Sequence, residues 1–122
     1  MITHPTAAEL AEALAALDSS PASDARGQFL ARVADNARAT LEREAALEPA
    51  AERAEIGRLR ALLGVEGDFT GLNAELCARL RDGRLAPLAP AVLAHLRASV
   101  IDQIAIDQPS YSGLAALEAR SA

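Results

Sequence analysis

Residues 25–47, ARGQFLARVADNARATLEREAAL, decide the fold class of this chain. Apolar residues recur there every three or four positions, which is the period of an amphipathic helix. The other positions are largely Ala, Arg and Glu, which are strong helix formers. The predicted buried stripe of this helix consists of Phe29, Leu30, Val33, Ala37, Leu41 and Leu47.

Capping and stop signals on either side of this segment predict further helices. Thr6 with Glu9, three residues later, has the capping-box pattern that starts a helix. Pro49 and Pro90 suit a first helical turn, and Pro49 also implies a bend or break beside Glu48. The predicted helices are 6–17, 25–47, 49–63, 71–82 and 90–107, and a short sixth helix within 110–122 is left open.

Composition supports an all-α fold. The chain of 122 residues has the usual size of a single domain, and it is 51% hydrophobic but only 2% aromatic. Its core must therefore be built from Leu, Val, Ile and Ala. Because no stretch alternates like a strand and no internal repeat is visible, we expect a single-domain bundle of about five helices, over residues 1–122.

Charge and cysteine content exclude several classes of function. The net charge of −5 argues against nucleic-acid binding, which requires concentrated positive charge. A single cysteine, Cys77, cannot form an internal disulfide and fits a reducing compartment. No apolar run reaches the ~20 residues that span a bilayer, and no signal peptide is visible. We therefore expect a cytoplasmic protein without a membrane segment.

Polar residues interrupt the predicted stripe of residues 25–47. If Val33 marks the centre of the buried face, Thr40 and Glu44 lie within about 20° of it and Asn36 about 60° away, at 100° per residue. Arg43, next to Glu44, could pair with that carboxylate. A buried carboxylate is costly unless it is paired, so these positions form a candidate site.

The helix predicted over 90–107 shows the same feature. Its expected buried stripe is Leu93, Leu96, Val100 and Ile104. Asp107 lies about 20° and Arg97 about 60° from the direction of Val100. Two interpretations remain open. The polar residues of both helices could line a pocket for a small polar or anionic ligand with Arg97 as its anchor, or they could form a structural network. The candidate ligand-binding residues are Asn36, Thr40, Arg43, Glu44, Arg97 and Asp107.

Other reactive side chains do not form a recognisable catalytic or metal site. His4 precedes the first cap and His95 points away from the Val100 stripe, so both are expected at the surface. Cys77 has no second thiol and no histidine near it in sequence. We therefore predict no catalytic residues, no metal and no cofactor. A basic patch is conceivable, with a solvated face of intrahelical ion pairs as its alternative; its residues would be Arg58, Arg60, Arg79, Arg81 and Arg84.

Two stretches resemble the signatures of a bacterial family of small helical proteins of unknown function. They are residues 28–36, QFLARVADN, followed by Arg43-Glu44, and residues 96–111, which begin LRAS and end IDQPSY. Members are often encoded beside kinases of the aminoglycoside-phosphotransferase type and acyl-CoA dehydrogenases. Matching positions include four of the candidate residues, Asn36, Glu44, Arg97 and Asp107.

Two hypotheses about function follow. The resemblance and the absence of a recognisable catalytic set favour an accessory or interaction protein whose partner is such a kinase or dehydrogenase, and exposed apolar helix faces could also support a homodimer. The alternative is a small-ligand-binding protein or enzyme that acts on an acyl-CoA or a phosphorylated metabolite. Whether the protein is an enzyme stays open, with the non-enzymatic interpretation favoured.

Overall fold

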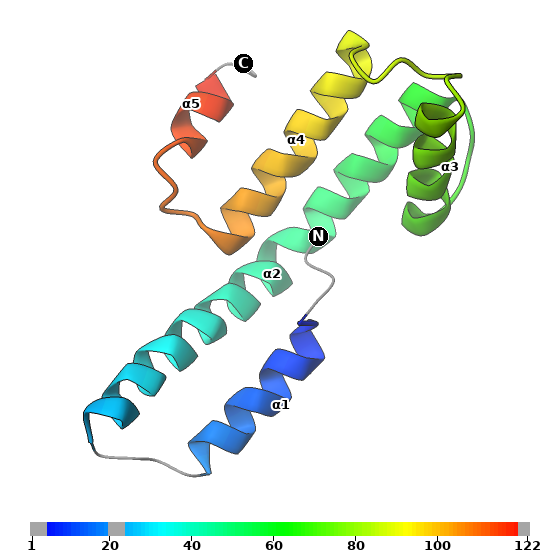
Figure 1. The fold of residues 1–122 in the computed structure, drawn as a ribbon. Coiled ribbons are helices and arrows are strands. Elements are labelled where there is room, and N and C mark those ends of the chain that lie inside the picture. Colours follow the sequence, from blue (N-terminus) through cyan, green and yellow to red (C-terminus); the bar gives the residue numbers. More distant parts are fainter. Residues whose placement is uncertain (1–4, 20–23, 120–122) are drawn as a thin grey trace. The chain divides into compact units, whose positions relative to one another are not determined.

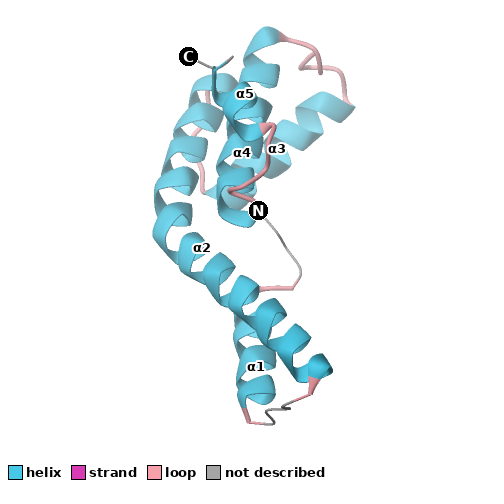
Figure 2. Ribbon diagram, turned by 90° about the vertical axis from the view of Figure 1, so that its left-hand side faces the viewer, coloured by secondary structure: helices cyan, strands magenta, loops and turns pink. Residues whose placement is uncertain are grey.

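The computed structural model describes residues 5–19 and 24–119, which form helices joined by loops (Figures 1 and 2). The expected all-α class is confirmed. The chain forms two compact units, residues 1–46 and 47–122, and α2 contributes to both. The helices within the described ranges are α1 (Ala7–Asp18), α2 (Ala25–Leu63), α3 (Phe69–Arg81), α4 (Pro90–Asp107) and α5 (Leu114–Ala119).

A single helix, α2, stands where the sequence predicts two, over 25–47 and 49–63. No break occurs beside Glu48, although Pro49 lies inside the helix. Proline removes its own N–H and so leaves the carbonyl of Ala45 without a helical donor, at a cost of about 3 kcal/mol. Both Ala45 and Pro49 are exposed, so water can reach that carbonyl. Strong helix formers on either side of Pro49 favour a continuous helix.

In the first unit, α1 lies beside the first half of α2 (Figure 1). The predicted capping box is present: the Thr6 hydroxyl accepts from the Glu9 N–H at 3.2 Å, and the Glu9 carboxylate accepts from the Thr6 N–H at 2.6 Å. Gly27 and Ala34, two turns apart on α2, are both buried. Their small side chains permit close packing between helices.

The predicted stripe of this half of α2 is displaced around the helix. Phe29 and Val33 are 57% and 47% exposed, whereas Ala34 is only 3% exposed. Because Val33 and Ala34 differ by about 100° around the helix, the buried face lies well away from the expected centre. Leu30, Ala37 and Leu41 are half-buried. The expectation that Phe29, Val33 and Leu47 are buried is wrong, since the small side chains of Gly27 and Ala34 form the buried positions instead.

The second unit contains a leucine core between the second half of α2 and α3. Leu59 and Leu63 of α2 pack with Leu72 and Leu76 of α3, and Leu59 has no exposed surface. The core is completed by the half-buried Ile56, Leu62, Leu80 and Leu85. Asp68 caps α3 by accepting from the Gly71 N–H at 2.7 Å. The turn between α2 and α3 begins at Gly64, whose φ of +67° favours glycine.

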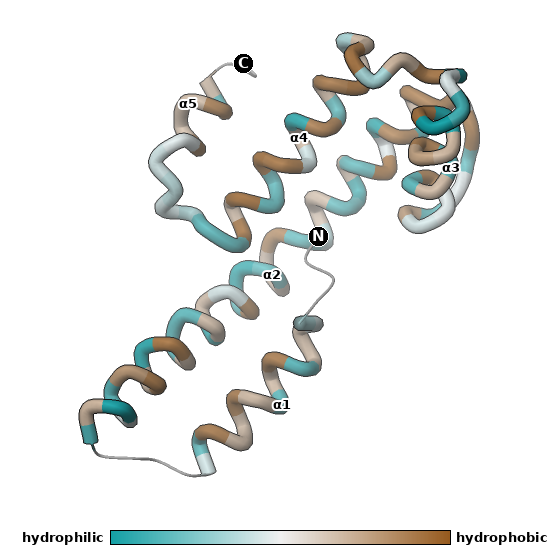
Figure 3. The backbone as a smooth tube through the Cα atoms, in the orientation of Figure 1, coloured by the Kyte–Doolittle hydropathy of each residue, from teal (hydrophilic) through white to brown (hydrophobic). Residues whose placement is uncertain are grey.

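Helix α4 buries a different face from the one that the sequence predicts. Val92, His95 and Ile106 are buried, whereas Leu93 and Val100 are 46% and 51% exposed. The predicted orientation of this helix is therefore wrong, as is the expectation that His95 lies at the surface. Hydrophobic residues recur around most of α4 (Figure 3), so hydropathy alone does not distinguish one face from another.

The remaining predicted boundaries agree closely with the structure. The helix predicted over 90–107 is α4, and those predicted over 6–17 and 71–82 differ from α1 and α3 by one or two residues. The short helix left open within 110–122 is α5. Tyr111 lies in the loop before α5, and its ring is 2.5 Å from where a Cβ on Gly113 would stand. A larger residue at that position would require the exposed Tyr111 ring to move.

The leucine core supplies the first testable prediction. Replacing the fully buried Leu59 by Ala removes apolar contacts and leaves a cavity, so we expect Leu59→Ala to lower the free energy of unfolding by about 2–5 kcal/mol. Urea denaturation followed by circular dichroism measures this loss. Leu88 is 80% exposed, and Leu88→Ala should change stability by less than about 0.5 kcal/mol. Equal effects of the two substitutions would contradict the core described above.

Candidate functional site

The four candidate residues on α2 lie in the first unit. Asn36 is exposed, and Thr40, Arg43 and Glu44 are half-buried. The Thr40 hydroxyl donates to the Asn36 carbonyl at 3.0 Å and accepts from Arg43 Nη2 at 3.0 Å. The structure therefore brings the side chains of Thr40 and Arg43 together, and the contact with Asn36 is to its backbone oxygen. These contacts run along the surface of one helix.

The other two candidate residues, Arg97 and Asp107, lie on α4 in the second unit. Arg97 Nη2 donates to the Leu117 carbonyl of α5 at 2.8 Å. Asp107 Oδ2 accepts from Gln103 Nε2 at 2.7 Å. Within the described residues no ion pair joins Arg97 to Asp107. Arg97 instead connects α4 to α5, and the partner of Asp107 is a neutral amide.

A row of exposed apolar side chains runs along α4. We call Leu93, Leu96 and Val100 the α4 stripe; they are 46%, 42% and 51% exposed. Their spacing of three and four residues places them on one face of the helix, and Asp107 lies on the same face at the C-terminal end. Contiguous exposed apolar surface of this kind marks interaction sites more often than isolated exposed leucines do.

The α4 stripe ends in a pocket between α4, α5 and the loop that joins them, which we call the α4–α5 pocket. Its volume is about 370 Å³ and it opens to solvent. Val100 belongs both to the stripe and to the wall of the pocket. The residues that line it are Val100, Ile104, Asp107, Gln108, Tyr111 and Leu117. Apolar walls with a few polar groups are typical of binding pockets, and this volume is in the lower part of the ~300–1,000 Å³ range.

A polar network on the opposite face of α4 joins this helix to the second half of α2. Arg58 Nη2 donates to Asp102 Oδ2 at 3.2 Å and to Ser99 Oγ at 3.4 Å. Ser99 Oγ also donates to Glu55 Oε1 at 2.8 Å, and His95 Nε2 lies 3.9 Å from the same oxygen. Sequence reasoning missed this network. Its signal was present, because residues 95, 99 and 102 share one face of a helix, as do 55 and 58.

The chemistry of this network is structural. The Ser99 hydroxyl donates to a carboxylate and makes no hydrogen bond to the imidazole of His95 within the described chain, so no activated nucleophile forms. His95 is 4% exposed and its Nδ1 is buried without a hydrogen-bond partner among the described residues. Burial lowers the pKa of His95; the nearby Glu55 carboxylate acts to raise it and the Arg58 guanidinium lowers it further. Burial therefore favours the neutral form of the His95 imidazole.

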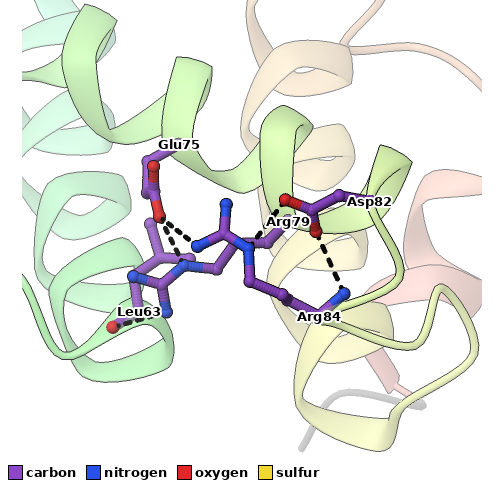
Figure 4. A network of polar contacts seen from close by, with 5 residues as sticks. All are labelled: Leu63, Glu75, Arg79, Asp82 and Arg84. Atoms are coloured by element: carbon purple, nitrogen blue, oxygen red, sulfur yellow. Dashed lines mark hydrogen bonds and ion pairs between the residues drawn. The ribbon is translucent and has the colours of Figure 1, made fainter.

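The arginines of the conceivable basic patch are largely engaged with carboxylates. Arg79 binds Glu75 at 2.6 Å and the Leu63 carbonyl at 2.8 Å, and Arg84 binds Asp82 at 2.7 Å and Glu75 at 3.3 Å (Figure 4). The Arg79 side chain lowers the pKa of Glu75, and the backbone N–H and side chain of Arg84 lower the pKa of Asp82.

The two arginines of this set on α2 also have acidic partners. Arg60 pairs with Glu66 at 2.9 Å and Arg58 with Asp102 at 3.2 Å. The alternative of a solvated, paired face therefore describes these contacts better than an anion-binding patch.

Residues 5–19 and 24–119 contain no group of three His, Cys, Asp or Glu side chains that could hold a metal ion. Cys77 is an exposed free thiol on α3. Within the same ranges, no helix combines the length and the apolar character needed to cross a bilayer.

Fold and contacts together define a small all-α protein with an exposed apolar stripe and an adjoining acidic pocket. The sequence matches a protein family described as a domain of unknown function (DUF6285), over residues 21–111. The chain belongs to this family. No curated protein and no solved structure matches it. The resemblance to a family of unknown function is thereby confirmed, and the matched residues include both the α4 stripe and the polar network.

The buried histidine supplies the second testable prediction. Because the pKa of His95 is lower in the folded protein than its ordinary 6.5, the unfolded chain binds the proton more tightly. Its contribution to stability is complete above pH 6.5 and is lost as the pH falls through the folded-state pKa. We expect His95→Gln to flatten the fall in free energy of unfolding between pH 7 and 5. One such group contributes at most about 1.4 kcal/mol per pH unit.

Urea denaturation at several pH values measures this slope. The matched control is His4→Gln, because His4, which lies outside the described residues, is predicted from the sequence to be exposed. His4→Gln should keep the slope of the parent protein. Identical slopes for the parent and His95→Gln would show that the imidazole titrates as if it were in water.

Proposed function

We propose that this protein is an accessory protein that binds another protein through the α4 stripe. One observation carries the proposal: Leu93, Leu96 and Val100 lie in one row on the outside of a well-formed helix, each more than two-fifths exposed. Covering three such side chains stabilises a complex by the hydrophobic effect, about 25 cal/mol for each Å² of apolar surface removed from water. Recognition of a helix by its i, i+3 and i+7 side chains is a recurrent mode of protein binding.

The arrangement of reactive groups supports a non-enzymatic role. The imidazole of His95 is buried in the network with Glu55 and Ser99, where little of it is accessible from solvent. No hydrogen bond joins the thiol of Cys77 to a basic side chain in the described residues. The His95 and Ser99 side chains thus join α4 to α2.

The partner that we propose is a kinase of the aminoglycoside-phosphotransferase type or an acyl-CoA dehydrogenase. This choice rests on the resemblance of residues 28–36 and 96–111 to a family often encoded beside such enzymes. A single free cysteine fits the reducing cytoplasm, where we expect the two proteins to meet. A second copy of this chain is the competing occupant of the stripe, because a self-complementary apolar face produces a symmetric dimer.

A small-ligand function is the second candidate, and the α4–α5 pocket is the observation that favours it. Its volume of about 370 Å³ suits a small organic molecule. The carboxylate of Asp107 in the wall would repel a phosphate or an acyl-CoA, and Arg97 donates to the Leu117 carbonyl. A thermal-shift screen with CoA thioesters and nucleotides tests this candidate. Stabilisation that disappears in Arg97→Ala would favour it over the accessory function.

Affinity purification from the native host provides the third testable prediction. The tagged protein should retain a kinase or acyl-CoA dehydrogenase of the kind named above, identified by mass spectrometry. Val100→Glu places a charge in the middle of the stripe, and we expect it to reduce the retained partner at least tenfold. The matched control is Leu88→Glu, which adds the same charge at an exposed leucine outside α4 and should retain the partner fully.

Light scattering of the purified protein distinguishes the occupants. A monomer that loses its partner on Val100→Glu agrees with the accessory function. A dimer that dissociates on Val100→Glu would assign the stripe to self-association instead. Retention of the partner unchanged by Val100→Glu would place its binding surface elsewhere on the molecule.

A further inference from the structure

The α4–α5 pocket places the carboxylate of Asp107 at the end of the α4 stripe. Asp107 accepts a hydrogen bond from Gln103 Nε2 at 2.7 Å, and it forms no ion pair in the described part of the chain. Arg97, also on α4, donates to the Leu117 carbonyl of α5. A half-buried carboxylate next to apolar walls is stabilised by any cation that can reach it.

Two further features give this end of α4 a negative potential. The C-terminus of a helix carries a partial negative charge from its unpaired carbonyls, and α4 has no basic residue in its last turn. The whole chain has a net charge of −5. Both effects attract a positively charged group to the α4–α5 pocket and repel an anion.

The remaining walls suit the stem of a basic side chain. Val100, Ile104 and Leu117 are apolar, and the ring of Tyr111 lies in the wall with 49% of its surface exposed. Arg and Lys carry a long methylene stem that packs on apolar surface while the charged end reaches a polar partner. The face of an aromatic ring adds an attraction for a guanidinium or ammonium group.

We propose that the α4–α5 pocket receives an Arg or Lys side chain of the protein whose apolar helix covers the α4 stripe. Because Val100 belongs to both surfaces, one continuous partner segment can fill them together. The partner segment is an amphipathic helix with an apolar face and one basic residue near the end that meets Asp107. The apolar contacts supply affinity, and the basic residue fixes the direction in which the helix lies. This inference rests on the proposed accessory function and names the chemistry of its partner.

A pair of small probes tests the pocket without the partner. n-Butylguanidinium reproduces the end of an arginine side chain, and n-butylurea is its uncharged analogue of nearly the same shape. Methyl NMR of the labelled full chain should show n-butylguanidinium shifting the signals of Val100, Ile104 and Leu117. We expect n-butylurea to bind at least tenfold more weakly. In Asp107→Asn, which keeps an acceptor for Gln103, the two probes should bind equally weakly.

The matched control is Glu42→Gln, a carboxyl-to-amide change at an exposed position of α2, which should leave both titrations unchanged. Equal affinity of the two probes for the parent protein would overturn the inference. Unchanged binding of n-butylguanidinium to Asp107→Asn would do the same, because the cation would then be held elsewhere.

Partner binding separates this inference from the proposed function. The accessory function and the basic side chain are both supported if three results are found together. The parent protein retains the partner, Asp107→Asn retains about tenfold less, and Val100→Glu retains still less. Full retention by Asp107→Asn together with loss by Val100→Glu would overturn the basic side chain and leave the accessory function standing. Binding of n-butylguanidinium by a protein that captures no partner would assign the pocket to a small free cation and overturn the partner.

Discussion

The polar contacts between α2 and α4 are the constraint on which the rest of the second unit depends. Arg58 pairs with Asp102, and Glu55 accepts from Ser99, so these four side chains fix one face of α4 against α2. The Arg58 and Asp102 side chains are 28% and 37% exposed, so breaking the pair leaves two partly desolvated charges at a cost that solvent screening reduces. Rotation of α4 to bury its leucines would separate these pairs. The network therefore keeps the α4 stripe at the surface.

Exposure of the stripe and shape of the pocket thus have a common origin. The buried direction through His95, Ser99 and Asp102 lies about 120° around the helix from that through Val100 and Asp107. Residues on the second direction are left to line a surface and, beside α5, a pocket. Arg97 holds α5 next to α4 by its bond to the Leu117 carbonyl, so the far wall of the pocket is positioned by a charged hydrogen bond. A structural network on one face thereby leaves an apolar surface exposed on another.

The sequence predicts part of the arrangement of the candidate residues. Asp107 does lie beside the apolar row that includes Val100, as the spacing predicts, and it lines a pocket. The row is exposed, however, and Asp107 accepts from Gln103 whereas Arg97 donates to the Leu117 carbonyl of α5. Asn36, Thr40 and Arg43 do interact, as the i, i+3 and i+4 spacings allow. What they share is a helix surface, and whether they bind a ligand remains a hypothesis.

Local sequence determined which residues form helices and where most of these begin and end. The Thr6–Glu9 capping box, the glycine after Leu63 and the proline at the start of α4 act through their own backbone neighbours, so no distant contact can override them easily. Tertiary structure alone decided which face of α4 is buried, whereas the helix formers on both sides of Pro49 favour a continuous α2 locally. Since α4 is apolar on most sides, its rotation was set by ion pairs and hydrogen bonds to α2. Those contacts depend on the position of α2, which the hydrophobic period of α4 cannot predict.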